Sequence, residues 1–205
     1  MTVKKGLFIV FAAIIVLIPI YLAVSSENIL NNGKLYKFKP IAYDPFDPFR
    51  GKFLRVNYET DNVPTKFDFE ERETAYVSIG VDKEGFAFFD EAYKSPPKDK
   101  DYLQATIKWA GVTEALSQEI EAGIDQDDFD ITSIDTRSTV GIEIPDNMNK
   151  YFINEDDALR AEKVMARERQ NIYIGVRILD GQVRLDNIFV HDQPILDYID
   201  SKRKK

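Results

Sequence analysis

The chain has 205 residues, with 35 acidic against 27 basic side chains and a formal net charge of −8, a balance that argues against a nucleic-acid partner. It contains no cysteine, which excludes disulfides, a thiol nucleophile and a thiolate metal site. Without its apolar N-terminal segment the chain keeps roughly 175–180 residues, which is enough for one well-packed core.

The N-terminal segment has the pattern of a membrane anchor. Lys4 and Lys5 precede an uncharged apolar run, Leu7 to Val24, whose 18 residues are about the minimum for a membrane-spanning helix. Pro19 is tolerated in such a helix. By the positive-inside rule, residues 1–6 lie in the cytoplasm and everything after Val24 lies outside. We therefore expect a single-pass protein that contacts the lipid bilayer through this run.

Two other interpretations of this segment stay open. Its charged start, apolar middle and small residues Ala23, Ser25 and Ser26 also suit a signal peptide that is cleaved near Ser25. A buried helix of a soluble protein is the third, although a run that is apolar on every face seldom fits so small a domain. The anchor is favoured because the run is long for a signal peptide. The rest of the chain then divides into a polar linker over 25–34, a folded part over 35–199 and a solvated basic tail over 200–205.

A stretch rich in proline and aromatic residues comes early in the folded part. Asp44 and Asp47 each precede a proline and should be extended, and residues 48–51 suit a tight turn. Strict alternation follows, as in a half-buried strand. The two faces of this strand are Leu54, Val56 and Tyr58 on one side, and Phe53, Arg55 and Asn57 on the other.

Residues 50–58 of this stretch resemble the motif Gly-Asp-Tyr-x-x-Leu-x-Tyr, which names the GDYXXLXY-domain family of bacterial membrane-anchored proteins. Gly51 and Tyr58 match the motif. Phe53 replaces the first Tyr and Val56 replaces Leu, and both exchanges keep strand character. Lys52 replaces Asp and reverses a charge, so a carboxylate role at that position is in doubt.

The resemblance extends beyond the motif. Residues 151–155 resemble a stretch in the family's second half, although an acid at a helix N-terminus is the simpler explanation of Glu155. Over most of residues 36–199, the resemblance implies an extracytoplasmic domain anchored to the bacterial cytoplasmic membrane, with no established activity. The positions that carry it, taken as structural, are Asp47, Pro48, Arg50, Gly51, Lys52, Phe53, Val56, Tyr58 and Glu155.

Loops and strands alternate through the middle of the chain. Residues 61–66 suit a proline-containing loop, and residues 75–81 suit an alternating strand. A turn at 82–85 and the apolar residues 86–89 predict the return strand of a hairpin. Residues 103–109 predict a further strand. Its apolar face would contain Leu103, Ala105, Ile107 and Trp109.

Residues 112–130 are ambiguous. Their Glu and Ala content predicts a short helix. The acidic run 125–130 raises the question of calcium, but it lacks the glycine and the final glutamate of an EF-hand loop. We therefore expect a solvated acidic loop and no metal.

The second half of the chain repeats the strand pattern around a helix. Strands are expected at residues 139–144, 172–178 and 183–185, with a turn at 179–182 between the last two. Asn154 is a suitable N-cap for a helix that runs to about Arg169. The narrow apolar stripe expected on this helix contains Ala158, Ala161 or Glu162, and Met165, which alternate with Leu159 and Val164.

Two hairpins in the chain share one pattern. Tyr76 to Pro96 and Tyr173 to Pro194 both have a strand, a glycine turn, an apolar return strand and a proline. This predicts an internal duplication, with a coincidence between hairpins as the alternative. The predicted fold class is α+β and β-rich. It has two related antiparallel β units, at about 35–110 and 135–199, the second with an inserted helix, after one N-terminal transmembrane helix.

Motifs for catalysis are scarce. The only histidine, His191, stands beside Asp192, and a His-Asp-Ser triad is compatible with the spacing. The Gly-x-Ser-x-Gly elbow is missing, however, so a histidine in a surface loop is favoured. One histidine without cysteine does not make a usual zinc site, and the chain has no dinucleotide or phosphate loop, so no cofactor is expected. A carboxylate pair for glycoside hydrolysis stays open among 35 acids.

The favoured function is an extracytoplasmic interaction or accessory domain without a catalytic motif, which acts with another membrane protein. Two alternatives are an envelope hydrolase that uses carboxylates or His191, and a small-ligand sensor. A cluster of perturbed acids in one cleft would favour the hydrolase. An exposed apolar patch or groove would favour the interaction domain, and an enclosed apolar pocket between the halves would favour the sensor.

Overall fold

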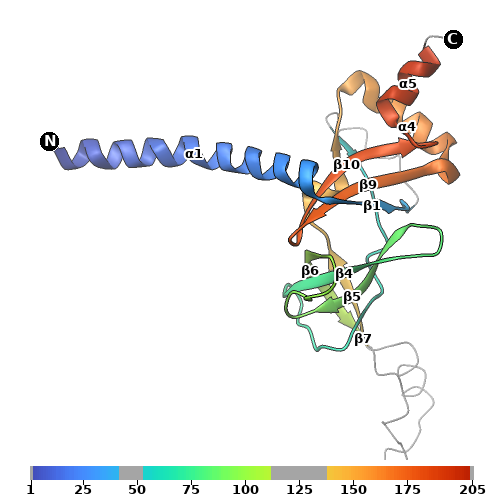
Figure 1. Cartoon of the computed structure of the whole chain (residues 1–205), viewed down its shortest axis with the longest axis horizontal. Helices are drawn as coiled ribbons and strands as arrows, with labels where there is room; N and C mark the ends of the chain where they lie inside the picture. Colours follow the sequence, from blue (N-terminus) through green and yellow to red (C-terminus); the bar gives the residue numbers. More distant parts are fainter. Residues whose placement is uncertain (1, 42–52, 112–137, 204–205) are drawn as a thin grey trace, which may run out of the picture.

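The computed structural model describes residues 2–41, 53–111 and 138–203. Figure 1 shows one long helix, α1 (Thr2–Asn32), that projects from a domain with two lobes. One lobe combines an antiparallel sheet with helices, and the other is built from strands. The chain thus has the predicted β-rich α+β fold after an N-terminal apolar helix.

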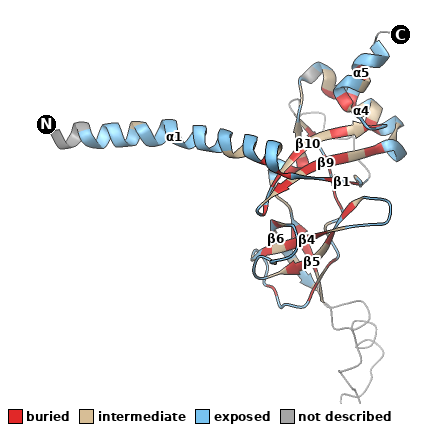
Figure 2. Cartoon of the chain, viewed as in Figure 1, coloured by how far each residue is buried: buried red, intermediate tan, exposed pale blue. Residues whose placement is uncertain are grey.

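Helix α1 does not end where the apolar run ends at Val24. It continues through the expected polar linker, 25–34, as far as Asn32, and strand β1 (Lys34–Phe38) follows. Residues 25–32 contain neither proline nor glycine, so nothing in them breaks a helix. Ile29 is only 5% exposed because it packs against the domain. Figure 2 shows that α1 is otherwise exposed along most of its length.

Five strands form a closed barrel, which is the lobe without helices. The pairing runs from β3 to β5, β4, β6, β7 and back to β3, and only the β3–β5 pair is parallel. Closure leaves no free edge among these strands. Their bounds are β3 (Val63–Thr65), β4 (Thr74–Val81), β5 (Ala87–Tyr93), β6 (Tyr102–Gly111) and β7 (Ser138–Glu143).

The second lobe, called the helical lobe below, is an antiparallel meander to which the first strand is added. Strand β1 pairs with β9, β9 pairs with β10, and β10 pairs with β11. Helices α4 and α5 contribute Ala161, Met165, Ile195 and Ile199 to the core. The bounds are α4 (Glu155–Arg167), a 3-10 turn (Arg169–Asn171), β9 (Ile172–Leu179), β10 (Gln182–Val190), β11 (Gln193–Pro194) and α5 (Ile195–Arg203).

A two-stranded ribbon is separate from the strands of both lobes. It pairs β2 (Phe53–Arg55) with β8 (Lys150–Phe152), and α3 (Asp146–Asn149) immediately precedes β8. As predicted, Leu54, Val56 and Tyr58 are buried and the residues between them are more exposed. Buried and exposed side chains continue to alternate as far as Tyr58, beyond the three residues of β2. The sequence pattern therefore predicts the burial correctly but overestimates the length of the strand.

The two lobes do not follow the predicted halves at 35–110 and 135–199. Strand β1, from the first half, pairs with β9, and β7, from the second half, closes the barrel. Each lobe is therefore completed by a strand from the other half of the chain. The two predicted hairpins, β4–β5 and β9–β10, are present. Their origin by duplication stays a prediction.

Several local predictions are corrected. The loop expected at 61–66 contains β3, because Val63 and Thr65 are buried and pair with β7, while Pro64 between them has no N–H to leave unpaired. Trp109 is only half-buried, unlike Leu103 and Ile107, because the register shifts between Ile107 and Trp109. The fully buried face of β6 therefore ends at Ile107.

The C-terminal helix was missing from the sequence prediction. Only Ile195 and Ile199 of α5 are buried, and this is too short an apolar pattern to indicate a helix. The basic tail expected at 200–205 begins inside α5, which ends at Arg203. The predicted cap of α4 is confirmed, because Oδ1 of Asn154 accepts a hydrogen bond of 2.9 Å from the backbone N–H of Asp157.

Other predictions lie outside the described residues. They are the turn at 48–51 with Asp47, Pro48, Arg50, Gly51 and Lys52, the helix at 112–130 and the acidic loop at 125–130. Glu155 is described only as the first residue of α4.

Candidate functional site

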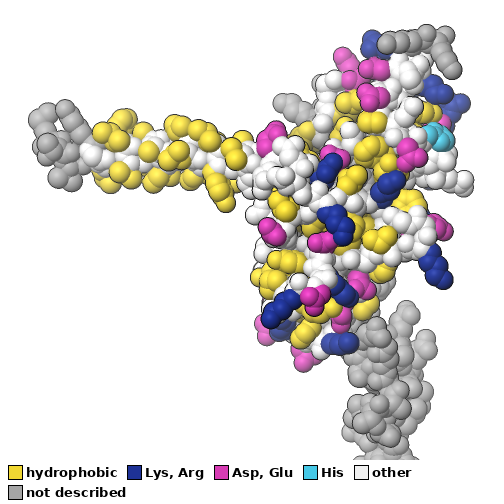
Figure 3. All heavy atoms as spheres, in the orientation of Figure 1, with side chains coloured by type: hydrophobic (Ala, Val, Ile, Leu, Met, Phe, Trp, Pro, Cys, Tyr) yellow, Lys and Arg dark blue, Asp and Glu magenta, His cyan; other side chains and the backbone are white. Residues whose placement is uncertain are grey.

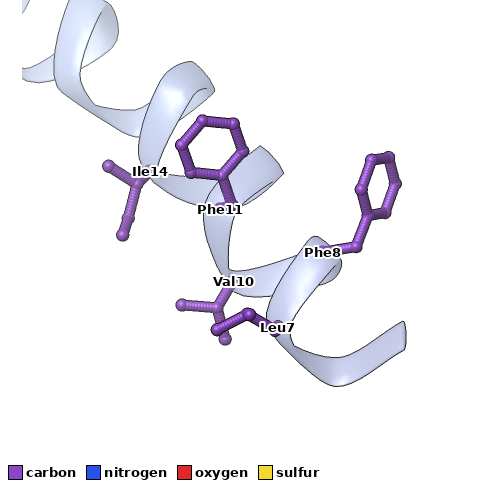
Figure 4. A pocket seen from close by; sticks show the side chains of 5 residues that line it. All are labelled: Leu7, Phe8, Val10, Phe11 and Ile14. Atoms are coloured by element: carbon purple, nitrogen blue, oxygen red, sulfur yellow. The ribbon is translucent and has the colours of Figure 1, made fainter. Parts of the chain in front are cut away.

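The apolar part of α1 is the most exposed hydrophobic surface of the described chain. The helix from Gly6 to Asn32 is long and apolar enough to cross a membrane, and its apolar window is not buried. Figure 3 shows hydrophobic side chains along this helix, and Figure 4 shows five of them around a shallow hollow. Leu7 is 73% exposed and Leu22 is 59% exposed. Burial of one such side chain away from water is favourable by about 1.5–3 kcal/mol, so this surface favours contact with lipid or with another protein.

The last turns of α1 are docked on the hairpin of β9 and β10. The Ser25 hydroxyl lies 3.3 Å from Oε1 of Gln182, and Arg184 donates a hydrogen bond of 2.6 Å to the Ser26 hydroxyl. Arg177 donates to the backbone carbonyl of Gly33 at 3.0 Å. With the buried side chain of Ile29, these contacts form a joint between the helix and the domain, called the anchor joint below.

Two residues of the family-like motif, Val56 and Tyr58, are buried and bonded to α3. The hydroxyl of Tyr58 donates to the carbonyl of Met148 at 2.8 Å, and the N–H of Val56 donates to the carbonyl of Asn149 at 2.9 Å. Burial raises the pKa of Tyr58 well above its ordinary value. These two motif residues thus hold the chain against α3, and Tyr58 stays neutral at any physiological pH.

The motif strand β2 begins at a partly exposed aromatic pair. Phe53 lies opposite Phe152 in the β2–β8 ribbon, with ring centroids 6.0 Å apart. Phe152 is 70% exposed, and the ammonium of Lys150 lies 5.6 Å from the centre of the Phe53 ring. The pair belongs to the same ribbon as the motif, but two rings alone do not define a pocket.

A groove lies beside β5, near the points where β1 and β3 join it. Strands β1 and β3 both pair in parallel with β5, at Phe38↔Ala87 and Thr65↔Ala92. The groove has a volume of about 350 Å³ and lies between the described residues 58–63 and the tip of the β4–β5 hairpin. It is lined by Phe38, Lys39, Tyr58, Glu59, Asn62, Val63, Asp82, Phe86, Ala87, Phe88 and Phe89.

This surface, called the distal groove below, combines rings with charges. The ring of Phe38 lies 5.5 Å from that of Tyr58 and 5.5 Å from that of Phe89. At the rim, the ammonium of Lys39 lies 4.4 Å from the centre of the Phe86 ring and 2.6 Å from Oε2 of Glu84. The groove is at the end of β1 that lies farther from α1.

The only histidine lies in the turn between β10 and β11. Nε2 of His191 is 3.1 Å from Oε2 of Glu168, and the Tyr198 hydroxyl donates to the other oxygen of Glu168 at 3.1 Å. Asp192 does not bond to His191 but accepts from the hydroxyl of Tyr173 at 3.0 Å. Among the described residues no hydrogen bond joins His191 to a serine, so the triad hypothesis gains no support.

The turn at His191 has an unusual backbone. His191 and Asp192 have φ values of 50° and 63°, in the left-handed region that residues with a Cβ seldom occupy. The side-chain bonds to Glu168 and Tyr173 hold this conformation. His191 has half of its side chain exposed and is absent from the lining of the distal groove.

The perturbed acids are spread over different parts of the molecule. Hydrogen bonds from Lys34 and Tyr36 lower the pKa of Asp101, those from His191 and Tyr198 lower the pKa of Glu168, and a backbone N–H and Lys94 lower that of Glu73. A general acid needs the opposite shift. The pKa shifts of Glu73, Asp101 and Glu168 are therefore all in the wrong direction for a general acid. Within the described residues no group of three or more His, Asp and Glu side chains is placed to hold a metal ion.

The sequence did not indicate the anchor joint or the distal groove. The joint connects Ser25 with Gln182 and Ser26 with Arg184, pairs that are 157 and 158 residues apart in the chain. A single sequence carries no pattern for such pairs. One indication existed, since Ile29 and Leu30 are an apolar pair inside an otherwise polar stretch, but the partners of this pair were not predictable.

The chain therefore belongs to the class of proteins in which one N-terminal helix, long and apolar enough to cross a membrane, leads into a β-rich α+β domain. A family model described as "GDYXXLXY protein" matches residues 15–188, and the chain belongs to this family. Neither a search of curated proteins nor a search of solved structures finds a match.

Proposed function

We propose that the chain is a single-pass protein of the bacterial cytoplasmic membrane, with residues 1–6 inside, 7–24 in the bilayer and the domain outside. Its domain is an interaction or accessory module that acts with another membrane protein. The observation that supports this proposal is the anchor joint, because it continues the apolar helix into the domain without a flexible linker.

The position of the joint brings the domain close to the bilayer. Ser25, the first residue after the apolar run, already contacts Gln182. One residue advances a helix by about 1.5 Å, so the first domain contact lies at the edge of the apolar span. A domain held in this way presents the same face to any neighbour in the membrane, which suits an accessory module.

A cleaved signal peptide is a poorer explanation of the joint. Cleavage near Ser25 would remove the Ser25 contact and leave Ile29 in a helical end of only about two turns. Without the apolar span, the remaining contacts of the joint could not orient the domain relative to the membrane. The anchor therefore explains both the length of α1 and its docked end.

Among the alternatives, a small-ligand sensor is favoured over a hydrolase. The distal groove, with about 350 Å³ between β1 and the barrel, is of the size that small ligands use. The hydrolase would need convergent acids, and the described acids with shifted pKa values, Glu73, Asp101 and Glu168, are dispersed.

The test is a pull-down with a C-terminal tag from native membranes dissolved in detergent. We expect the full chain to retain a membrane protein in stoichiometric amount. A shortened chain that begins at Ser26 lacks the apolar span and should retain little of it. If no partner is retained and the full chain is found free in the soluble fraction, both the anchor and the accessory module are wrong.

A further inference from the structure

The distal groove has the space and position of a ligand site. Its volume of about 350 Å³ lies near the lower end for small-molecule pockets, which suits a ligand with a single ring. Strand β1 starts at α1 and runs away from it, so the groove at the far end of β1 lies away from the anchor joint (Figure 1). A ligand can therefore reach it while the domain is docked on α1.

Aromatic side chains form the floor and the rim of this groove. Phe38, Tyr58 and Phe89 are 3%, 5% and 8% exposed, so the floor is fixed by the core. At the rim, Phe88 is 46% exposed, and its ring lies over the backbone of Gly80 on the neighbouring strand. An apolar or aromatic ligand would thus meet rings that are already in place, with little loss of side-chain freedom.

The charges around the groove are mostly negative. Lys39 is its only lining cation among the described residues, and Glu84 already neutralises it at 2.6 Å. The carboxylate of Asp82 accepts hydrogen bonds from two backbone N–H groups of the hairpin turn. Glu59 has no ion pair or hydrogen bond from its side chain among the described residues. Among the described residues, the one positive and three negative groups at the groove favour a cation.

One cation of the protein itself, the Lys39 ammonium, is already held beside the groove by a ring and a carboxylate. The Lys39 ammonium lies 4.4 Å from the centre of the Phe86 ring and also contacts a carboxylate. Ring faces attract cations in this geometry, and a carboxylate nearby strengthens the attraction. Glu59 and the exposed ring of Phe88, which both line the groove, offer the same combination of carboxylate and ring to a ligand from outside.

We propose that the distal groove binds a small organic cation, in which an ammonium group is attached to an aromatic or aliphatic body. The ammonium pairs with Glu59, and the apolar body lies against the exposed ring of Phe88. This proposal does not depend on the membrane partner proposed above, because it concerns the side of the domain away from α1.

The test uses the full chain in detergent micelles, titrated with 2-phenylethylammonium and followed by calorimetry or ligand-observed NMR. We expect saturable binding at one site. The neutral 2-phenylethanol, which has the same body, should bind about fivefold to tenfold more weakly, since it lacks the charge.

Two charge-matched variants locate the site. Glu59→Gln should weaken 2-phenylethylammonium about fivefold, whereas Glu71→Gln, which removes the same charge from an exposed residue outside the groove, should leave affinity unchanged. Phe88→Ala should weaken both ligands. Thermal unfolding of each variant checks that it is folded. Equal effects of the two glutamine variants, equal affinity for the two ligands, or no saturable binding would overturn the proposal.

Discussion

Lysines stand at both ends of β1, Lys34 as its first residue and Lys39 directly after its last, and both reach across to the barrel. Near the anchor, Lys34 lies 2.8 Å from Oδ2 of Asp101, and the Tyr36 hydroxyl donates to the same oxygen. At the far end, Lys39 lies 2.6 Å from Oε2 of Glu84. The two ion pairs are similar, yet one end of the lobe interface is closed and the other end opens into the distal groove.

The difference comes from what surrounds each pair. At the anchor end, the β9–β10 turn rests on β6: the N–H of Gln104 donates to the carbonyl of Gly181 at 3.1 Å, and a Cβ on Gly181 would lie 2.5 Å from the Tyr102 ring. At the far end, the turn at Gly85 has no described atom within 4 Å of such a Cβ. An exposed ion pair therefore does not close an interface, whereas close packing of backbone and ring does.

The largest expected effect comes from the two turn glycines. Both have positive φ, 79° at Gly181 and 87° at Gly85, which costs a residue with a Cβ about 1–2 kcal/mol. Gly181→Ala adds the clash with Tyr102, so we expect a total loss of about 2–4 kcal/mol.

Gly85→Ala is the matched control and should lose only about 1–2 kcal/mol. Thermal unfolding followed by circular dichroism measures both, and each kcal/mol should lower Tm by about 2–4 °C. Equal losses in the two variants would show that the β9–β10 turn is not packed against the barrel.

The next effect tests the anchor joint. Ile29→Ala removes a side chain that is 5% exposed, and we expect the domain to lose about 2–4 kcal/mol of stability in detergent micelles. Leu22→Ala, in the exposed apolar run, should leave the unfolding of the domain unchanged. Proteolysis between residues 25 and 33 should become faster in Ile29→Ala alone. If both variants behave like the unchanged protein, the helix is not docked.

A smaller, pH-dependent effect is expected at the closed end. Hydrogen bonds from Lys34 and Tyr36 lower the pKa of Asp101 below its ordinary value of 3.8. The unfolded chain therefore binds this proton at a higher pH than the folded chain does. The contribution of the pair is fully present above the unfolded pKa and is lost as pH falls through the folded pKa.

Asp101→Asn tests this contribution. Because the Asp101 side chain is 44% exposed, we expect a loss of only about 0.5–1 kcal/mol at neutral pH, and no difference in strong acid. Unfolding by urea at a series of pH values measures it. A difference that stays constant down to strong acid would contradict the assigned ion pair.

The smallest effect is expected at the open end. Lys39 and Glu84 have 57% and 69% of their side chains exposed, so their ion pair is screened by water. Glu84→Gln should leave Tm unchanged to within about 1 °C. A clear loss of Tm would mean that the two ends of β1 are closed by similar forces, against the comparison made above.

Local structure was predictable because neighbouring residues determine it. The alternation of Leu54, Val56 and Tyr58, the Asn154 cap and the two hairpins each follow from a few adjacent side chains. The membrane-length helix followed from the uncharged run. The family followed from the match at Gly51 and Tyr58 together with the apolar N-terminal segment and the second half of the chain.

Features that join distant residues were not predictable. Lys34 and Asp101 are 67 residues apart, and Lys39 and Glu84 are 45 residues apart. The exchange of β1 and β7 between the lobes depends on which strands pair, and many strands of this chain have similar patterns. The distal groove arises from this pairing, so it could not be expected before the topology was known.

The most direct test concerns the side of the membrane on which the domain lies. The chain has no cysteine, so a single introduced cysteine gives an unambiguous label. Lys83→Cys, in the exposed turn of the β4–β5 hairpin, and Thr2→Cys would each be treated with a membrane-impermeant maleimide in spheroplasts of a bacterial host. We predict labelling of Lys83→Cys in intact spheroplasts and of Thr2→Cys only after the membrane is disrupted, both in chains of full length. Labelling of Lys83→Cys only after disruption, or recovery of a shortened chain outside the membrane, would contradict an anchored domain on the outer side.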